Sequence, residues 1–247
     1  MDIIAIMAVV ILGYIILRLF EGKPNFTDSS IVRSEEYISR LLSIHNGSIT
    51  VSPARLVGWE GERDVLFLLE AVGKGIVYWN VGVRFRGQKC EYDILVLSPF
   101  GVLHVEVKAY AGTYVPAPGE PLQNPNNWEK VNPYTGEAKT TWSPVSQSLR
   151  ANNILQQTLT VTCEKSITVQ TVIVFPDKGF RVERMADSRL PWFNARNFQK
   201  FYRAFSHGLL NSPGLDLVDM VKIASVLGQC GFEPVFYDAE LFKKDGA

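Results

Sequence analysis

A chain of 247 residues with 47% hydrophobic residues is long enough to bury a sizeable core and to form a globular enzyme. Its 25 basic and 25 acidic side chains cancel, so any affinity for nucleic acid must come from a local patch or a bound cation. The three cysteines, Cys90, Cys163 and Cys230, lack the CxxC spacing of metal sites, which predicts reduced thiols and no structural zinc.

The first 23 residues have the pattern of a membrane anchor. No charged residue occurs from Ile3 to Leu17, and the apolar run continues to Phe20. At about 1.5 Å per helical residue, residues 3–20 span roughly 27 Å, close to one bilayer core. A cleaved signal peptide is the competing interpretation, but the start lacks a basic region and no small-residue cleavage site follows. Basic residues from Arg18 onward follow the segment, so we expect a single-pass protein of the inner (cytoplasmic) membrane with its body in the cytoplasm.

Residues 24–57 are predicted to hold a short linker and an amphipathic helix at 31–45. A second helix follows, because apolar residues recur at helical spacing and Gly73 is a suitable end: Val65, Leu68, Leu69, Val72. Glu62 falls on that same inward stripe. Residues 75–81 read as a strand, and 91–110 ("EYDILVLSPFGVLHVEVKAY") as a hairpin with "SPFG" as its turn.

The remainder of the chain alternates helices and strands. Residues 111–146 form a long excursion rich in Pro, Gly, Asn and Thr, with room for a small hairpin. Ser143 and Pro144 start a helix that reaches Leu159 and has Gln147 in its first turn. A β-branched strand is predicted at 167–176, then helices near 194–207 and 215–228. This order predicts an α/β fold with a mixed sheet flanked by helices.

The hairpin concentrates the chemistry of the sequence. With "SPFG" as the turn, Leu95 pairs with His104, Asp93 with Glu106 and Glu91 with Lys108. Cross-strand partners share a face. One face therefore holds Glu91, Asp93, Leu95, Leu97, Val102, His104, Glu106 and Lys108. The other face is apolar enough to be core, and it holds Tyr92, Ile94, Val96, Leu103, Val105 and Val107.

This register predicts that Asp93 and Glu106 lie side by side, where like charges repel. A divalent cation would offset the repulsion, and carboxylates with water and substrate phosphate are the usual ligands of Mg²⁺. Lys108, on the same face, is then suited to orient or activate a water and to stabilise charge at phosphorus. We therefore predict a site for Mg²⁺ or Mn²⁺ at Asp93 and Glu106.

Structural interpretations of the same residues remain open. The polar face is also typical of a solvated hairpin, with Glu91 and Lys108 as a surface ion pair worth less than about 1 kcal/mol. Glu62 is costly on a buried stripe without a partner, or is a first-turn residue favoured by the helix dipole. His104 has the pattern of a half-buried sheet residue, and Gln147 that of a polar residue at a helix start. The tryptophans of the excursion are more typical of loop anchors than of base-stacking platforms: Trp128 and Trp142.

Three segments together resemble a known family. "GERDVLFLL", "CEYDILVLSPFGVLHVEVKAYAG" and "SPVSQSLRANNIL" are similar to the nuclease-related domain (NERD), a branch of the restriction-endonuclease-like superfamily with the PD-(D/E)xK site. The resemblance spans roughly residues 58–176. It implies that Glu62 is the acidic residue of the first helix, Asp93 the metal-binding aspartate, Glu106 and Lys108 the "ExK" element, and Gln147 the glutamine of the following helix. The usual Pro before the aspartate is absent, because "EYD" stands there.

The sequence thus predicts a membrane-anchored, Mg²⁺- or Mn²⁺-dependent nuclease acting on DNA or RNA, with a role in bacterial defence or plasmid maintenance. We expect four parts: an anchor at 1–23, a linker with an amphipathic helix at 24–57, a nuclease core at 58–176 and a helical extension at 177–247 packed on it. Nucleic acid and the lipid bilayer, through residues 3–20, are the expected partners, with further proteins or a second copy of the chain as additional ones. The alternative function is a non-catalytic nucleic-acid or protein binding module tethered to the membrane.

Overall fold

The computed structural model describes residues 53–109, 112–121, 125–132, 134–176, 179–182, 189–210, 214–229 and 236–237. The membrane helix expected at 3–20 and the amphipathic helix expected at 31–45 lie outside these ranges. Among the helices that the structure describes, none has the length and apolar composition needed to cross a bilayer.

A mixed sheet forms the centre of the described domain, with the strand order β10-β1-β2-β3-β7-β9. The strands from β10 to β3 are antiparallel to their neighbours, whereas β3, β7 and β9 run parallel. Their bounds are β1 (Ile76–Phe85), β2 (Gln88–Ser98), β3 (Gly101–Val107), β7 (Val169–Phe175), β9 (Trp192–Asn194) and β10 (Phe236–Tyr237). The predicted α/β fold with a mixed sheet is confirmed.

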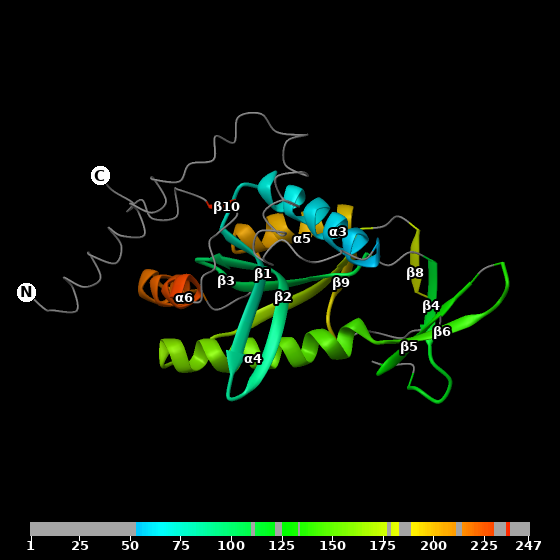
Figure 1. Cartoon of the computed structure of the whole chain (residues 1–247). Coiled ribbons are helices and arrows are strands. Elements are labelled where there is room, and N and C mark those ends of the chain that lie inside the picture. The colour runs from blue at the N-terminus through cyan, green and yellow to red at the C-terminus, as the bar shows by residue number, and fades with distance from the viewer. Residues whose placement is uncertain are drawn as a thin grey trace, which may run out of the picture. The chain divides into compact units, whose positions relative to one another are not determined.

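Helices cover both faces of this sheet (Figure 1). On the face that we call the α3 face, the buried side chains of the sheet pack against α3 (Pro53–Glu70) and α5 (Ala195–Ser206). On the opposite face, the α4 face, they pack against α4 (Pro144–Cys163) and α6 (Leu217–Gln229). Alternating residues of β2 serve the two cores, since Ile94 and Val96 face α3 while Leu95 and Leu97 face α4. Both faces of the predicted hairpin are therefore buried.

The helix starts follow the predicted signals. Ser143 is the N-cap of α4 and Pro144 its first residue. Asn194 caps α5, and its side chain accepts a 2.9 Å hydrogen bond from the backbone N–H of Asn197. Gly73, with φ of 71°, follows the end of α3, where a left-handed residue suits glycine. The start of α3 lies earlier than the first-turn interpretation of Glu62 required, because that helix begins at Pro53.

The excursion after Lys108 forms a second sheet, where the sequence indicated only a small hairpin. Its order is β6-β5-β4-β8, with bounds β4 (Gly112–Pro116), β5 (Asn127–Val131), β6 (Ala138–Trp142) and β8 (Phe180–Val182). Trp128 is 1% exposed and joins this sheet to the main one through contacts with Tyr114 and Phe175. Trp128 is thus an anchor of the excursion, in agreement with the structural interpretation, whereas Trp142 is 50% exposed.

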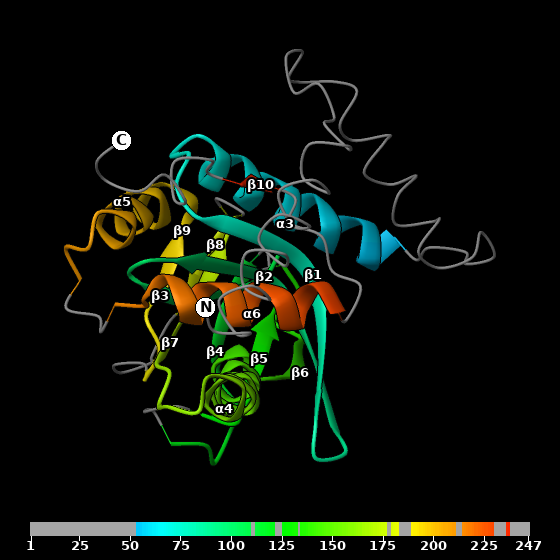
Figure 2. The same ribbon diagram turned by 90° about the vertical axis from the view of Figure 1, so that its left-hand side faces the viewer.

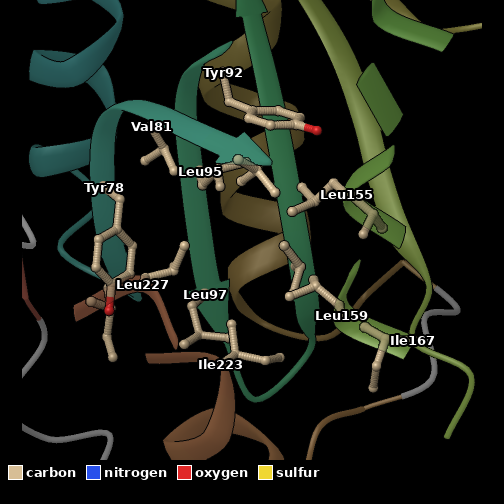
Figure 3. Close-up of a cluster of buried hydrophobic side chains, with 14 of the residues drawn as sticks. Tyr78, Val81, Tyr92, Leu95, Leu97, Leu155, Leu159, Ile167, Ile223 and Leu227 are labelled. Carbon is tan, nitrogen blue, oxygen red and sulfur yellow. The ribbon is translucent and has the colours of Figure 1, made fainter. Parts of the chain in front are cut away.

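One predicted face assignment is wrong. Tyr92 belongs to the α4 core with Leu95 and Leu97, not to the opposite core with Ile94 (Figure 3). The cause lies at Asn80 of β1, which has a left-handed φ of 54° opposite Asp93. At this position the side chains of both strands stop alternating regularly between the two faces of the sheet. A left-handed residue interrupts the alternation of a regular strand.

Candidate active site

The candidate site lies where β2 and β3 separate. Their ladder has the predicted register, with Leu95 opposite His104, and ends at Ile94 and Val105. Beyond this point β3 continues along β7, and the backbone N–H of Val107 donates a 2.7 Å hydrogen bond to Oδ2 of Asp93. The side-chain oxygen of Asp93 thus accepts the hydrogen bond that a backbone carbonyl of the neighbouring strand would accept in a regular ladder. Asp93 is held at the fork by the sheet itself.

Glu106 is buried at the same fork and is held as an anion. Its Oε1 lies 2.5 Å from Nζ of Lys108, and its Oε2 lies 3.3 Å from Nε2 of His104. Burial opposes ionisation of Glu106, but the charge of Lys108 and the contacts with His104 and Lys108 outweigh it and lower the pKa of Glu106 to about 2. The carboxylate side chain is 4% exposed. An ionised glutamate at such depth is stable chiefly because the ammonium of Lys108 accompanies it.

Asp93 has the opposite electrostatic balance. Burial, the negative charge of Glu106 and that of Glu62 raise its pKa well above the ordinary value. The charge of Lys108 and the hydrogen bond from Val107 act the other way without compensating. Burial and the neighbouring acids thus disfavour the anionic form of Asp93, and a bound cation would favour it.

Glu62 approaches the fork from α3. Its Oε2 accepts a 2.6 Å hydrogen bond from the indole Nε1 of Trp79, the neighbour of the kinked Asn80. Gly61 permits the approach, because a Cβ there would lie 3.0 Å from Cβ of Ala109 and 3.1 Å from Cγ of Pro176. The helix thus touches the chain directly after Lys108. Glu62 has a partly buried partner, and the first-turn interpretation of this residue is wrong because α3 begins at Pro53.

Gln147 lies in the first turn of α4, where its backbone N–H donates to the carbonyl of Ser143 at 3.1 Å. Val145 of the same turn packs against Ile173, the strand partner of Glu106. The start of α4 is thus near the strands of the site. Among the contacts of the described residues, none joins the Gln147 side chain to the acidic residues or to Lys108.

The solvated-face interpretation of the hairpin is wrong for its centre. His104 is 0% exposed and Glu106 3% exposed, because α4 and α6 cover this face. Glu91 alone of the predicted polar face is fully at the surface, and its strand partner in the structure is Gly82 of β1. The ladder of β2 and β3 ends before the predicted pairs of Asp93 with Glu106 and of Glu91 with Lys108.

The donor set suits a hard divalent cation. Within the described residues, no three His, Cys, Asp or Glu side chains are grouped as a ready metal centre. Asp93 and Glu106 provide two carboxylates, and Mg²⁺ commonly uses one or two carboxylates and completes its shell with water and substrate phosphate. Such an ion would offset the burial and the neighbouring negative charges that raise the pKa of Asp93. The residues present therefore fit the ion that the hairpin pattern suggested.

Sequence reasoning missed three residues that shape the site. Trp79 binds Glu62, Gly61 lets α3 approach, and Thr171 of β7 contacts the buried His104. The glycine had a usable signal, since Gly inside a helical pattern often marks close packing. The other two depend on which strands become neighbours. No local sequence pattern encodes which strands become neighbours.

Fold and site together define an α/β domain that gathers acidic side chains and a lysine where two adjacent strands of a mixed sheet part. Residues 57–176 match the family of the nuclease-related domain, NERD. These residues form a nuclease-related domain, as the motifs of the sequence indicated. No curated protein and no solved structure gives a significant match.

Proposed function

We propose that the chain is a membrane-anchored, Mg²⁺- or Mn²⁺-dependent nuclease that hydrolyses phosphodiester bonds of DNA or RNA. The observation that carries this proposal is the pairing of an electrostatically strained Asp93 with an ionised Glu106 that touches Lys108. A purely structural ion pair would need only Glu106 and Lys108. Asp93 adds a second negative charge, which burial and the neighbouring acids disfavour more than Lys108 and the Val107 N–H favour it.

In this proposal Asp93 and Glu106 hold the ion. When bound, the ion supplies Lewis-acid stabilisation of charge on the phosphoryl oxygens and lowers the pKa of a coordinated water. Lys108 lies 2.5 Å from Glu106, so its ammonium is fixed beside the reacting phosphate, where it orients the water and stabilises the pentavalent transition state. The water oxygen would form a bond to phosphorus as the bond to the leaving sugar oxygen breaks; the water gives a proton to solvent, and the departing sugar oxygen takes one up from solvent. Glu62 and Gln147, assigned by resemblance, would position water and substrate around this centre.

Support for a nucleic-acid substrate comes from the end of the β1–β2 hairpin. We call residues 81–92 the arm; it turns at Arg86 and Gly87, whose φ values of 47° and 80° fit a type I′ turn. The tip extends past the helices in both views (Figures 1 and 2). The register places Arg84 directly opposite Lys89, and Arg86 is exposed with Cζ 5.2 Å from the ring centroid of Phe85. Three cationic residues of the sequence thus fall at the end of the arm, where they would attract a polyanion: Arg84, Arg86 and Lys89.

The arm starts at the candidate site. Asp93 and Gly87 are six positions apart, which corresponds to about 20 Å of extended strand. A polyanion bound along the arm would therefore lead directly to Asp93. This local patch would provide the attraction that the neutral overall charge does not.

The remaining parts of the proposal rest on the sequence. The fold is taken to be of the restriction-endonuclease-like type, since the carboxylate at the strand fork and the "ExK" residues follow that pattern. Residues 3–20 would anchor the chain in the inner membrane with the domain in the cytoplasm. Defence or plasmid maintenance would be the biological role, with partner proteins or a second copy of the chain regulating activity.

The test is a cleavage assay with the purified full-length chain in detergent. DNA and RNA, single- and double-stranded, linear and circular, are incubated with Mg²⁺, Mn²⁺ or EDTA. We expect metal-dependent cleavage that falls at least about 100-fold in Asp93→Ala and Lys108→Ala, as for loss of a group that stabilises transition-state charge. Matched controls are Asp64→Ala and Lys200→Ala, both exposed in the structure, which should cleave like the wild type.

The alternative function, a non-catalytic binding module, predicts the opposite result. It expects tight, EDTA-insensitive binding of nucleic acid without turnover. Cleavage that persists unchanged in the Asp93 and Lys108 variants would show that the activity resides elsewhere. Repeating the panel with the products of neighbouring genes covers a nuclease that works only with a partner.

A further inference from the structure

His104 is a completely buried polar residue in direct contact with Glu106. It lies in β3, is 0% exposed, and faces the α4 side of the sheet with Leu95 and Val102. Its Nε2 lies 3.3 Å from Oε2 of Glu106. Two strand positions separate the residues, so both side chains emerge on the same face of β3.

Residues of two neighbouring strands contact the ring on its other sides. Nδ1 lies 3.4 Å from Oγ1 of Thr171, the partner of His104 in β7. The ring of Tyr92 packs edge-on against the imidazole with centroids 5.0 Å apart. Tyr92 is fixed in turn, because its hydroxyl donates a 2.9 Å hydrogen bond to the carbonyl of Ala151 in α4. The kink at Asn80 brings Tyr92 to this face.

For stability alone, histidine is a poor residue here. Nε2 makes no hydrogen bond of good geometry within the described residues, and a buried polar group left in that condition destabilises the fold. The surroundings are otherwise apolar and include Leu95, Val102 and the ring of Tyr92. An aromatic hydrocarbon side chain would fill the same space without that cost. The polar atom faces a single polar neighbour, Oε2 of Glu106.

We infer that His104 is a positioning residue that holds Oε2 of Glu106, so that Oε1 stays turned toward Lys108 and the cation. The terminal torsion of a glutamate is soft, so an unrestrained carboxylate rotates readily. Contact with His104 at one oxygen and Lys108 at the other sets its plane. Partners behind a metal ligand commonly change metal affinity or activity by about 10–100-fold. The inference rests on the proposed function, since it assigns a task to His104 in the same site.

A histidine with only a packing role behaves differently from one with a positioning role. Loss of a packing residue lowers the free energy of unfolding and leaves the metal affinity of the folded protein unchanged. Loss of the positioning contact leaves the free energy of unfolding equal or higher, because an unsatisfied buried nitrogen is removed, and weakens metal binding. With a packing role, the variant is less stable and binds metal normally; with a positioning role, it is equally or more stable and binds metal more weakly. Measuring both quantities on one variant therefore separates them.

The experiment uses the full-length chain in detergent and the variants His104→Phe, His104→Gln and Thr171→Val. Mn²⁺ binding is measured by calorimetry and unfolding by denaturant in metal-free buffer. We expect His104→Phe to bind Mn²⁺ about 10–100-fold more weakly with unfolding unchanged or more difficult. His104→Gln should recover part of the affinity, because its amide N–H can donate to Glu106. His207→Phe is the matched control, since His207 is exposed after α5 and should bind Mn²⁺ normally.

Three outcomes would overturn the inference. Wild-type affinity in His104→Phe would leave the proposed nuclease function intact and remove the positioning role. Should that variant fail to fold, Thr171→Val decides, because it frees one side of the ring and should weaken Mn²⁺ binding several-fold; unchanged affinity there rejects the role. A wild-type chain that binds no Mn²⁺ rejects the metal site and the positioning role together.

Discussion

The Asp93 carboxylate accepts a 2.7 Å hydrogen bond from the backbone N–H of Val107 at the point where β2 and β3 stop pairing. The sheet thereby fixes the position of a carboxylate whose anionic form the protein disfavours, since burial, Glu106 and Glu62 all raise its pKa. Glu106 has the opposite character, with a pKa lowered to about 2. Removing the negative charge should therefore stabilise the protein at Asp93 and destabilise it at Glu106.

Replacing Asp93 by asparagine should stabilise the metal-free protein. Because the folded-state pKa of Asp93 lies above its unfolded value, its favourable contribution exists at low pH and is lost as pH rises through the folded pKa. We expect Asp93→Asn to unfold about 2–4 °C above the wild type at pH 8, which corresponds to roughly 1 kcal/mol for a domain of this size. This difference in unfolding temperature should become smaller toward pH 4, where the wild-type carboxyl is protonated. Added Mn²⁺ should raise the midpoint of the wild type only.

Circular dichroism at several pH values provides the measurement, with Asp64→Asn, exposed on α3, as the control that should show no pH-dependent gap. A wild type as stable as Asp93→Asn at pH 8 without metal would mean that the site is not electrostatically strained.

Glu106→Gln should destabilise the protein near neutral pH. The substitution leaves the ammonium of Lys108, 15% exposed, without its carboxylate partner, and breaking a buried pair in this way costs about 3–5 kcal/mol at most. Since the folded pKa of Glu106 lies below its unfolded value, its stabilising contribution is present above the unfolded pKa and disappears as pH falls toward about 2. Denaturant unfolding at pH 7 and pH 3 should therefore show a smaller difference between the two proteins at pH 3. A difference that does not depend on pH would assign the destabilisation to packing.

The hairpin was predictable because its pattern is local. "SPFG" fixed the turn, and the alternation on both strands then set the register that the structure shows, down to Leu95 opposite His104. The starts of α4 and α5 were predictable for the same reason, since Ser143 and Asn194 signal a cap without reference to the rest of the fold.

The kink at Asn80 was not predictable from alternation, which assumes a regular strand. A left-handed residue at that position changes the face of Tyr92 and the angle at which Asp93 leaves the sheet. The environment of His104 was missed for another reason. Its burial depends on β7 and α4, which lie far along the chain, and propensity within the hairpin contains no information about them. The sequence thus brought Asp93, Glu106 and Lys108 to attention as candidates, but their burial and charge balance were not predictable from it.

Two glycines of α3 should respond differently to alanine. A Cβ at Gly58 would meet no atom within 4 Å, so Gly58→Ala should stabilise the protein by up to about 1 kcal/mol through helix propensity. At Gly61 the added Cβ would lie 3.0 Å from Ala109 and 3.1 Å from Pro176, so Gly61→Ala should lack that stabilisation and shift Glu62 away from the fork. Thermal unfolding and cleavage are measured together. Gly61→Ala should reduce cleavage about 10-fold or more, and equal behaviour of the two variants would show that the close approach of α3 is irrelevant to the site.

The arm should contribute to binding of nucleic acid without contributing to the chemical step. Replacing Arg84, Arg86 and Lys89 by alanine removes three cationic residues from a hairpin that begins at Asp93. We expect weaker binding of DNA or RNA at about 0.15 M salt. The slope of log K against the logarithm of the salt concentration should become shallower by about 0.9 for each duplex phosphate that the variant no longer neutralises.

Binding is measured by fluorescence anisotropy in the Asp93→Asn background, which prevents cleavage. The control substitutes Arg181, Arg196 and Lys200, exposed residues that remove the same charge. Because both triple variants change the net charge equally, weaker binding confined to the arm variant identifies a local interaction with the phosphates. Equal weakening in both variants would indicate a general field effect and reject the arm as the binding surface.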